Sequence, residues 1–416
     1  VLMFQASYKT NDWSGDVKAY GVDSFTGLLI ETPKWSASDT LTATNWESRN
    51  ILTYNGSDGA VFDPTESSID WEDALGSSYA NIINYVSGQN DIPGFRVSSK
   101  LLGDIVHSSP VFDNGVVYVG ANDGMLHAFQ ITSTAGVING VEKFAYVPSF
   151  VYQNLENLTQ APLEHKYYVD LTPTVATGYE LLGGEEIVQT ILVGGLGKGG
   201  KGYFALDITD PNSMDKDKVL WEFPDDATAD DHASDMGYSF SRPVVVQTNS
   251  KNSDEAWVVI TGNGYDSQTG KAILFVLNPQ TGGVTRKIST NDATGNGLST
   301  PVAVDVNYDR RVDFVYAGDL MGNMWKFDLT GDEASQWSVA YHDGENNQPL
   351  FQAKGPTGAP QPITTKPEVM FHPKQHEMRS HGLMVLFGTG KLMGESDFSD
   401  NNRQSVYGIW DYGDRA

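Results

Sequence analysis

The residues best suited to chemistry in this chain lie in one short stretch, "DVNYDRRVD", which runs from Asp305 to Asp313. Carboxylate or amide side chains occupy alternate positions there, at Asp305, Asn307 and Asp309, and another carboxylate follows four residues later. Like charges held so close repel one another unless a cation lies between them. Oxygen ligands at loop positions 1, 3 and 5, with a backbone carbonyl at position 7, are the pattern by which a protein loop wraps Ca²⁺. The spacing therefore predicts a calcium site.

Numbering the loop from Asp305 as position 1 also identifies the remaining ligands. The backbone carbonyl of Arg311 falls at position 7, and Asp313 closes the shell. The predicted ligands are Asp305, Asn307, Asp309, Arg311 through its carbonyl, and Asp313. The side chains of Arg310 and Arg311 must then point away from the ion. Mg²⁺ suits this loop less well, because it requires a tighter octahedron and retains its waters.

Two features separate this loop from an EF-hand. It has neither Gly at position 6 nor a bidentate Glu at position 12, so flanking helices are not implied. Instead it lies between the apolar runs "TPVAV" and "VDFVYAG", which predict two strands joined by a hairpin. The alternative is a solvated acidic turn that binds no metal, which is common on a negatively charged surface.

The strands that would hold the loop belong to a repeat. Units begin near residues 108, 171, 241, 299 and 365, each with a polar residue followed by a proline. A short apolar run follows, then a turn, a strand ending in Gly, a second turn and further strands. About four strands per unit is the content of one propeller blade. Only the unit from Ser299 carries alternating acids at its first turn; the corresponding turns of three other units are "DNG" from Asp113, "TNSKNSDE" from Thr248 and "HPKQHEMRSH" from His372.

This repeat predicts an all-β fold, a β-propeller that forms a single domain over residues 1–416. Strands within residues 1–107 would complete and close the ring. We favour seven blades over six because residues 49–108 contain further strand-like runs, "RNILTYN" and "GFRVSSKLLGDIV". A solenoid is the competing architecture.

One helix is expected beside the blades, near residues 71–88. Apolar residues at Leu75, Tyr79, Ile82, Ile83 and Val86 recur at helical spacing. The preceding aspartate at 70 suits an N-cap and the glycine at 88 suits a helix end. We expect this helix to pack on the propeller, with partner docking as the alternative.

Composition narrows the class of partner. The chain has 53 Asp and Glu against 27 Lys and Arg, a formal charge of -26, which disfavours nucleic acid and favours cations. It has no cysteine, hence no disulfide, thiolate metal site or cysteine nucleophile. No apolar run is long enough to span a membrane, and the first residues suggest a strand, so we expect a piece of a longer protein.

Two other motifs resemble ligand sites, but the secondary structure expected around each argues against that function. "GLGKGG", from Gly195 to Gly200, resembles a nucleotide-binding loop, yet the strand-like "YFALDIT" follows where a phosphate loop needs a helix. His372, His376 and His381 could hold zinc, but they lie in a long turn with no helix to fix their spacing. We therefore expect no nucleotide and no catalytic activity.

Taken together, these motifs resemble the C-terminal domain of the PilC/PilY family of type IV pilus tip-associated proteins. The resemblance covers nearly the whole chain, and its most specific parts are the glycine-rich run before "YFALD" and the acidic loop before "YAGDLMGNMWKFD". The matching stretches are "WSGDVKAY" from Trp13, "RNILTY" from Arg49, "LGDIVHSSPV" from Leu102, "YVGANDGMLHAF" from Tyr118, "GGLGKGGKGYFALDIT" from Gly194, "STPVAVDVNYDRRVDFVYAGDLMGNMWKFDL" from Ser299 and "FGTGK" from Phe387.

The resemblance implies a modified β-propeller of the quinoprotein-like type that binds calcium and lies at the pilus tip or outer membrane of a Gram-negative bacterium. It implies contact with pilins, roles in pilus extension and retraction, twitching motility and virulence, and adhesion to a surface or host-cell receptor. The family's ligand pattern matches Asp305, Asn307, Asp309, Arg311 and Asp313. The chain has no Arg-Gly-Asp tripeptide, so integrin binding is not implied. The alternatives are a quinone-dependent dehydrogenase and a structural propeller with an incidental calcium ion.

Overall fold

The computed structural model describes residues 1–181, 187–225, 232–291, 293–371 and 382–413. The chain divides into two compact units, Val1–Ala227 and Thr228–Ala416. Strands dominate both units, and each unit has its own buried apolar clusters. The all-β class expected from the repeat is therefore confirmed.

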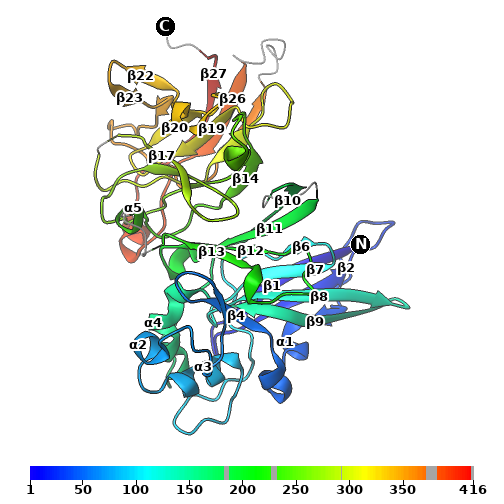
Figure 1. Cartoon of the computed structure of the whole chain (residues 1–416). Helices are drawn as coiled ribbons and strands as arrows, with labels where there is room; N and C mark the ends of the chain where they lie inside the picture. Colours follow the sequence, from blue (N-terminus) through cyan, green and yellow to red (C-terminus); the bar gives the residue numbers. More distant parts are fainter. Residues whose placement is uncertain (182–186, 226–231, 292, 372–381, 414–416) are drawn as a thin grey trace. The chain divides into compact units, whose positions relative to one another are not determined.

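Three sheets make up the N-terminal unit (Figure 1). The first has the order β1-β2-β3, the second β5-β4-β9-β8-β7-β6, and the third β10-β11-β12-β13. All their pairings are antiparallel except that between β4 and β9. The bounds are β1 Leu2–Lys9, β2 Ser14–Gly21, β3 Trp35–Ser36, β4 Ile51–Tyr54, β5 Gly59–Val61, β6 Val111–Asp113, β7 Val116–Gly120, β8 Leu126–Thr134, β9 Val137–Tyr146, β10 Thr174–Tyr179, β11 Val188–Gly195, β12 Tyr203–Asp207 and β13 Val219–Phe223.

The C-terminal unit also consists of small antiparallel sheets built from consecutive strands. One sheet has the order β14-β15-β16-β17, and another β18-β19-β20-β21 with β24 also paired to β20. A third has the order β25-β26-β27, and β22 and β23 form a separate hairpin. The bounds are β14 Val244–Gln247, β15 Trp257–Gly262, β16 Ile273–Leu277, β17 Val284–Ser289, β18 Val302–Val304, β19 Phe314–Gly318, β20 Asn323–Asp328, β21 Ser338–Val339, β22 Tyr341–Asp343, β23 Asn346–Gln348, β24 Phe351–Gln352, β25 Glu368–Phe371, β26 Leu383–Gly388 and β27 Val406–Asp411.

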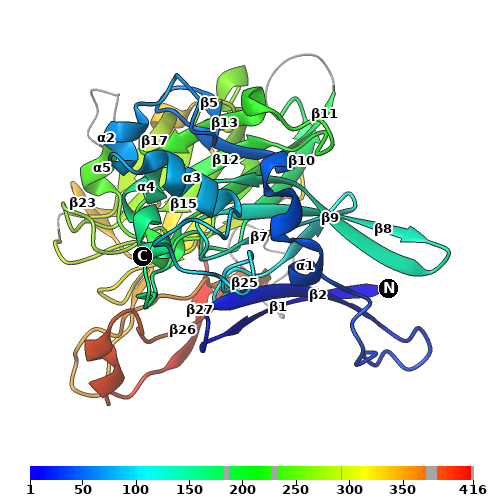
Figure 2. The same cartoon turned by 90° about the horizontal axis from the view of Figure 1, so that it is seen from below.

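The predicted repeat units correspond to these sheets. Units from 108, 171, 241 and 299 each contain four consecutive strands, β6–β9, β10–β13, β14–β17 and β18–β21, and the unit from 365 contains β25–β27. Tight turns reverse the chain where the sequence indicates. Asn114 and Gly115 have φ values of 43° and 84° between β6 and β7, as a two-residue hairpin requires. The β8–β9 hairpin extends well beyond its sheet (Figure 2).

The expectation for residues 49–108 needs correction. "RNILTYN" does form a strand, but this strand, β4, adds in parallel to β9 instead of starting a blade. "GFRVSSKLLGDIV" contains no strand, only a single bridge between Gly103 and Ser14. The described residues form six sheets of three or more strands. Seven blades are therefore not confirmed, and closure of the ring stays a prediction.

The predicted helix is present in two pieces. α2 spans Trp71–Leu75 and α3 spans Tyr79–Ser87, separated at Gly76, whose φ of 77° ends the first piece. The Asp70 side chain caps α2 by accepting from the Asp73 amide at 3.1 Å. Ile82 and Ile83 are buried in the cluster that includes β4 and β9, so the packing role is confirmed. The other helices are α1 Ala37–Thr40, α4 Tyr152–Leu155 and α5 His232–Asp235.

Candidate metal centre

The acidic loop joins two paired strands, as its flanking apolar runs predict. β18 and β19 are antiparallel neighbours, and Val304 lies opposite Phe314, so residues 305–313 close the hairpin. β19 and its neighbour β20 carry fully buried apolar side chains, including Val315 and Trp325, whereas those of β18 are partly buried. The loop is therefore held at both ends by a rigid support.

The backbone of the loop turns sharply without glycine. Tyr308 and Arg310 have φ values of 64° and 73°, in the left-handed region that side chains with a Cβ rarely adopt. Arg310 stands at loop position 6, where an EF-hand uses glycine for its turn. The Asp305 carboxylate holds this conformation, because it accepts from the amides of Tyr308 at 2.6 Å and Arg310 at 2.7 Å.

The next two predicted ligands are tied to the same turn. Asn307 accepts from the Asp309 amide through Oδ1 at 2.8 Å, and its Nδ2 donates to Asp309 Oδ2 at 3.2 Å. Asp309 Oδ1 accepts from the Arg311 amide at 2.8 Å. Asp305, Asn307 and Asp309 are thus brought together, with their oxygens currently engaged by backbone amides.

Asp313 occupies a different environment, since it is only 4% exposed. Its Oδ2 accepts from the Val306 amide at 2.8 Å, and its Oδ1 accepts from Asn249 Nδ2 at 3.3 Å. Burial raises the pKa of Asp313, and the charges of Asp309 and Asp305 raise it further. A cation close to a buried carboxylate that feels two further negative charges would be stabilising.

The donor set fits a hard cation, although its geometry is not that of a coordination shell. All five predicted donors are oxygens, the ligand type that Ca²⁺ prefers. Within the described ranges, however, no three His, Asp or Glu side chains have the spacing of a metal site. The calcium ligands therefore stay a prediction.

Neighbouring segments that the sequence did not single out support the loop. Arg311 Nη1 donates to the Thr248 carbonyl at 2.5 Å, so this side chain points toward the β14–β15 connection, as the predicted site requires. Asn249 Nδ2 donates to the Val312 carbonyl across 63 residues of chain. The Tyr308 ring lies 5.5 Å from that of Phe371 in β25. No local sequence signal could have revealed these contacts between sheets.

The glycine-rich run does not form a phosphate loop. β11 ends at Gly195, Gly197–Gly199 form one short 3-10 turn, and β12 begins at Tyr203. A Cβ on Gly199 would lie 2.0 Å from the Tyr168 carbonyl oxygen, so close packing explains this glycine. The alternative zinc ligands His372, His376 and His381 lie outside the described residues.

Comparison with known proteins shows the family of this chain. Residues 103–416 match the family described as the PilY1 beta-propeller domain. The chain belongs to the PilY1 family. It is 34% identical, over 98% of its length, to the type IV pilus biogenesis factor PilY1 of Pseudomonas aeruginosa strain UCBPP-PA14, of which it covers 39%. A PilY1 homolog of Xylella fastidiosa is 40% identical over 71% of this chain and 19% of the relative.

A solved PilY1 structure supports the same placement. The crystal structure of the Pseudomonas aeruginosa PilY1 C-terminal domain has a TM-score of 0.56 and 38% identity, covering 72% of this chain and 58% of that one. The chain thus spans about two fifths of the length of the Pseudomonas PilY1 relative. In the described part of the chain, no helix is long and apolar enough to cross a membrane.

Proposed function

We propose that this chain is the β-propeller part of a type IV pilus biogenesis factor, and that its Asp305–Asp313 loop binds Ca²⁺ to control pilus extension and retraction. Twitching motility and attachment to surfaces or host cells would depend on that control. The proposed location is the pilus tip or outer membrane of a Gram-negative bacterium, with pilins and a host-cell receptor as partners. The names of the relatives support the pilus role.

The observation that carries the calcium proposal is the β18–β19 hairpin, which places Asp305, Asn307 and Asp309 on one tight turn that also binds the buried Asp313 through the Val306 amide. Asp305 and Asp309 both raise the pKa of that buried group, so the three carboxylates share one electrostatic neighbourhood. Asp305, Asn307, Asp309, the Arg311 carbonyl and Asp313 would hold the ion. Bound Ca²⁺ supplies the positive charge that this neighbourhood lacks. The carboxylates would then turn from the amides and order the hairpin more strongly.

Calorimetric titration of Ca²⁺ into the purified chain tests the site. We expect one binding event with a dissociation constant between about 10⁻⁷ and 10⁻³ M, the span of sensor and extracellular sites. Asp309→Ala should abolish it, whereas Asp343→Ala, at an exposed aspartate in β22, should leave it unchanged. Absence of binding to the unaltered chain, or equal binding by both variants, would refute the proposal.

The role of the ion in the pilus needs the full-length protein. Cells carrying Asp305→Ala together with Asp313→Ala should show altered pilus number and reduced twitching. If calcium binding is lost while pilus number and motility stay normal, the ion is incidental and the propeller is a structural part. Dye reduction that depends on an added quinone would instead support the dehydrogenase alternative.

A further inference from the structure

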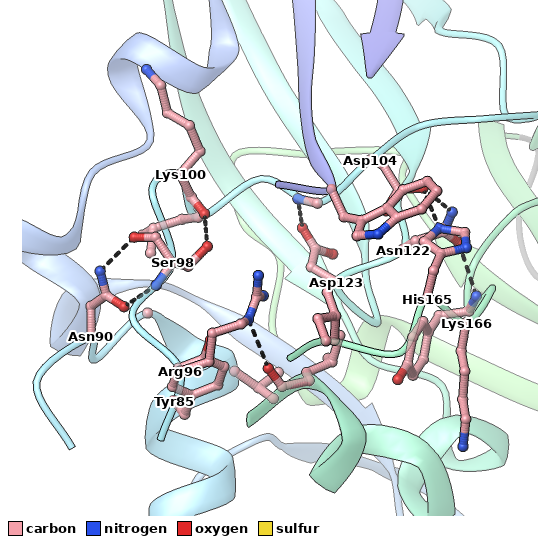
Figure 3. A pocket seen from close by; sticks show the side chains of 18 of the residues that line it. Tyr85, Asn90, Arg96, Ser98, Lys100, Asp104, Asn122, Asp123, His165 and Lys166 are labelled. Atoms are coloured by element: carbon pink, nitrogen blue, oxygen red, sulfur yellow. Dashed lines mark hydrogen bonds and ion pairs between the residues drawn. The ribbon is translucent and has the colours of Figure 1, made fainter. Parts of the chain in front are cut away.

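A small pocket in the N-terminal unit has no part in the proposed calcium site (Figure 3). It lies among α3, the segment from Asn90 to Gly103, the β7–β8 turn and the segment from Leu163 to Tyr168. Its cavity volume is about 50 Å³, enough for roughly four water molecules. Its lining includes Trp13, Tyr85, Arg96, Asp104, Asp123 and His165.

The two acids in the pocket already have partners. Asp104 is 2% exposed, and its Oδ2 lies 2.8 Å from both Asn122 Nδ2 and His165 Nε2. Asp123 Oδ2 accepts from the Gly103 amide at 2.7 Å and lies 3.1 Å from His127 Nε2. Burial lowers the pKa of His127, but Asp123 and Glu142 raise it to about 9, so this imidazole is protonated at neutral pH. Both carboxylates therefore already have hydrogen-bond partners, and the charge of Asp123 is paired with that of His127.

Arg96 stands in contrast to these paired acids. Among the residues that the structure describes, its side chain makes one long hydrogen bond, from Nε to the Leu158 carbonyl at 3.4 Å, and no ion pair with an acid. Figure 3 shows its guanidinium group directed toward the middle of the pocket. The terminal nitrogens of a guanidinium are a rigid pair of donors that match the two oxygens of a carboxylate.

Tyr85 adds a second polar group without a partner. Its side chain is only 9% exposed, and its hydroxyl makes no hydrogen bond within the described part of the chain. Burial raises the pKa of Tyr85, while the charge of Arg96 and its side-chain contact with the hydroxyl lower it, so the hydroxyl lies against the guanidinium. A hydroxyl that meets only a cation still has a proton to donate, and a ligand oxygen bound at Arg96 would accept it.

Two lysines near the pocket are engaged elsewhere. Lys100 Nζ forms an ion pair with Asp39 at 2.9 Å, and Lys166 Nζ donates to Asn154 Oδ1 at 3.3 Å. Arg96 is therefore the cation left to meet a ligand. The ring of Trp13 stacks on that of His165 with centroids 3.7 Å apart, and provides an aromatic wall beside the polar groups.

We propose that this pocket binds the carboxylate group of a small organic acid, anchored by Arg96. The cavity admits the carboxylate end, and the remainder of the ligand contacts the rim beside Trp13. A neutral amide of the same shape would bind less well, because it offers no charge to the guanidinium. Such selectivity would be unusual on a chain whose formal charge of -26 repels anions elsewhere.

Ligand titrations of the whole chain, followed by NMR and tryptophan fluorescence, test the proposal. The probes are acetate, galacturonate and N-acetylglycine, with acetamide, galactose and N-acetylglycinamide as their uncharged counterparts. We expect each acid to bind more tightly than its neutral counterpart. Galacturonate binding more tightly than N-acetylglycine would identify a sugar acid as the ligand class, and the reverse order an acylated amino acid.

Three variants assign the effect to the pocket. Arg96→Gln should weaken acid binding at least tenfold, and Arg96→Lys should weaken it less. Arg403→Gln, at an exposed arginine in the other unit, should bind as the unaltered chain does. If Arg96→Gln does not fold, the unaltered chain still tests the proposal, because its affinities for the acids and for their neutral counterparts can be compared. Equal binding of both ligand types, or no effect of Arg96→Gln in a folded protein, would overturn the proposal.

Discussion

A buried group of charged side chains ties strands of the N-terminal unit together. Arg49 lies 2.7 Å from Glu142 through Nε and 2.9 Å through Nη2, while His127 Nδ1 lies 2.7 Å from the same carboxylate. His127 is fully buried. Burial raises the pKa of Glu142, but Arg49 and His127 outweigh it and lower that pKa to about 2. Glu142 is thus the shared counter-charge for two buried cations.

Glu142→Gln should therefore destabilise the chain strongly. It leaves Arg49 and His127 buried without their shared anion, and breaking a buried pair in this way typically costs about 3–5 kcal/mol. Urea unfolding followed by circular dichroism measures the loss. Asp332→Asn, which breaks the exposed pair with Lys251, is the control and should change little. Equal effects of the two substitutions would contradict a structural role for the buried group.

Glu222 is also a buried acid, but its pKa is raised whereas that of Glu142 is lowered. Its Oε1 accepts from Tyr146 Oη at 2.7 Å and from the Ser149 amide at 2.8 Å, and Ser149 Oγ donates to its Oε2. Burial raises its pKa from 4.5 to about 7, despite these hydrogen bonds, which act to lower it. Between those two pH values the folded chain holds a proton at Glu222 that the unfolded chain has lost.

Stability should consequently fall as pH rises through this range. The raised pKa means that Glu222 contributes fully below about pH 4.5, and that its contribution is lost by about pH 7, a change of about 3 kcal/mol. Glu222→Gln mimics the protonated form and should remove that part of the slope. Thermal unfolding of both proteins from pH 5 to 8 measures the difference. The raised pKa of His127 affects both proteins alike and cancels. Parallel pH profiles would show that Glu222 is ionised throughout.

At the scale of elements, glycine spacing that suggests a ligand loop instead serves packing between strands. The Gly195–Gly200 run connects β11 to β12, and Gly199 lies directly against the Tyr168 carbonyl. The same glycine motif can therefore bind a phosphate in one structural context and allow close packing in another. A helix after the glycines would expose amides to a phosphate, whereas the strand found here requires the chain to pass close to its neighbour.

Gly199→Ala should lower stability by about 1–3 kcal/mol, the usual effect of inserting a methyl group into a packed site. The reason is the 2.0 Å distance between the added Cβ and the Tyr168 oxygen. Gly388→Ala in β26 is the matched control, because a Cβ there meets nothing within 4 Å. Chemical unfolding of the two variants compares them. A stable Gly199→Ala protein would show that the segment shifts freely.

The helix in two pieces shows which features of an element the apolar periodicity of the sequence can predict. The apolar spacing correctly predicts the buried face, including Ile82 and Ile83, and both ends at Asp70 and Gly88. The interruption at Gly76 depends on a left-handed backbone conformation that periodicity does not register. Both pieces lie in the N-terminal unit, with α2 beside α4 (Figure 1).

For the whole molecule, net charge and calcium should affect stability separately. A formal charge of -26 makes the folded chain repel itself, so NaCl should raise the unfolding temperature by screening. Ca²⁺ at one hundred times its dissociation constant should add about 2.7 kcal/mol, through preferential binding to the folded state. The two effects are separated by adding Ca²⁺ at constant ionic strength.

Thermal unfolding in chelator, CaCl₂ and MgCl₂ provides the measurement. The unaltered chain should unfold at a higher temperature in CaCl₂ than in either other condition. Asp309→Ala should lose this increment yet keep its response to NaCl. The same unfolding temperature in chelator and in CaCl₂ would count against a calcium site in the loop.

The sequence by itself determined the class of fold, most of the repeat units and the position of the acidic loop, because these depend on local alternation, turn residues and spacing along the chain. The parallel pairing of β4 with β9, the support of the loop by Thr248 and Asn249, and the grouping of Arg96 with Tyr85 and Trp13 were decided only by tertiary structure. Each joins segments distant in sequence. Their contacts depend on how folded sheets and helices pack, and no local pattern encodes that packing.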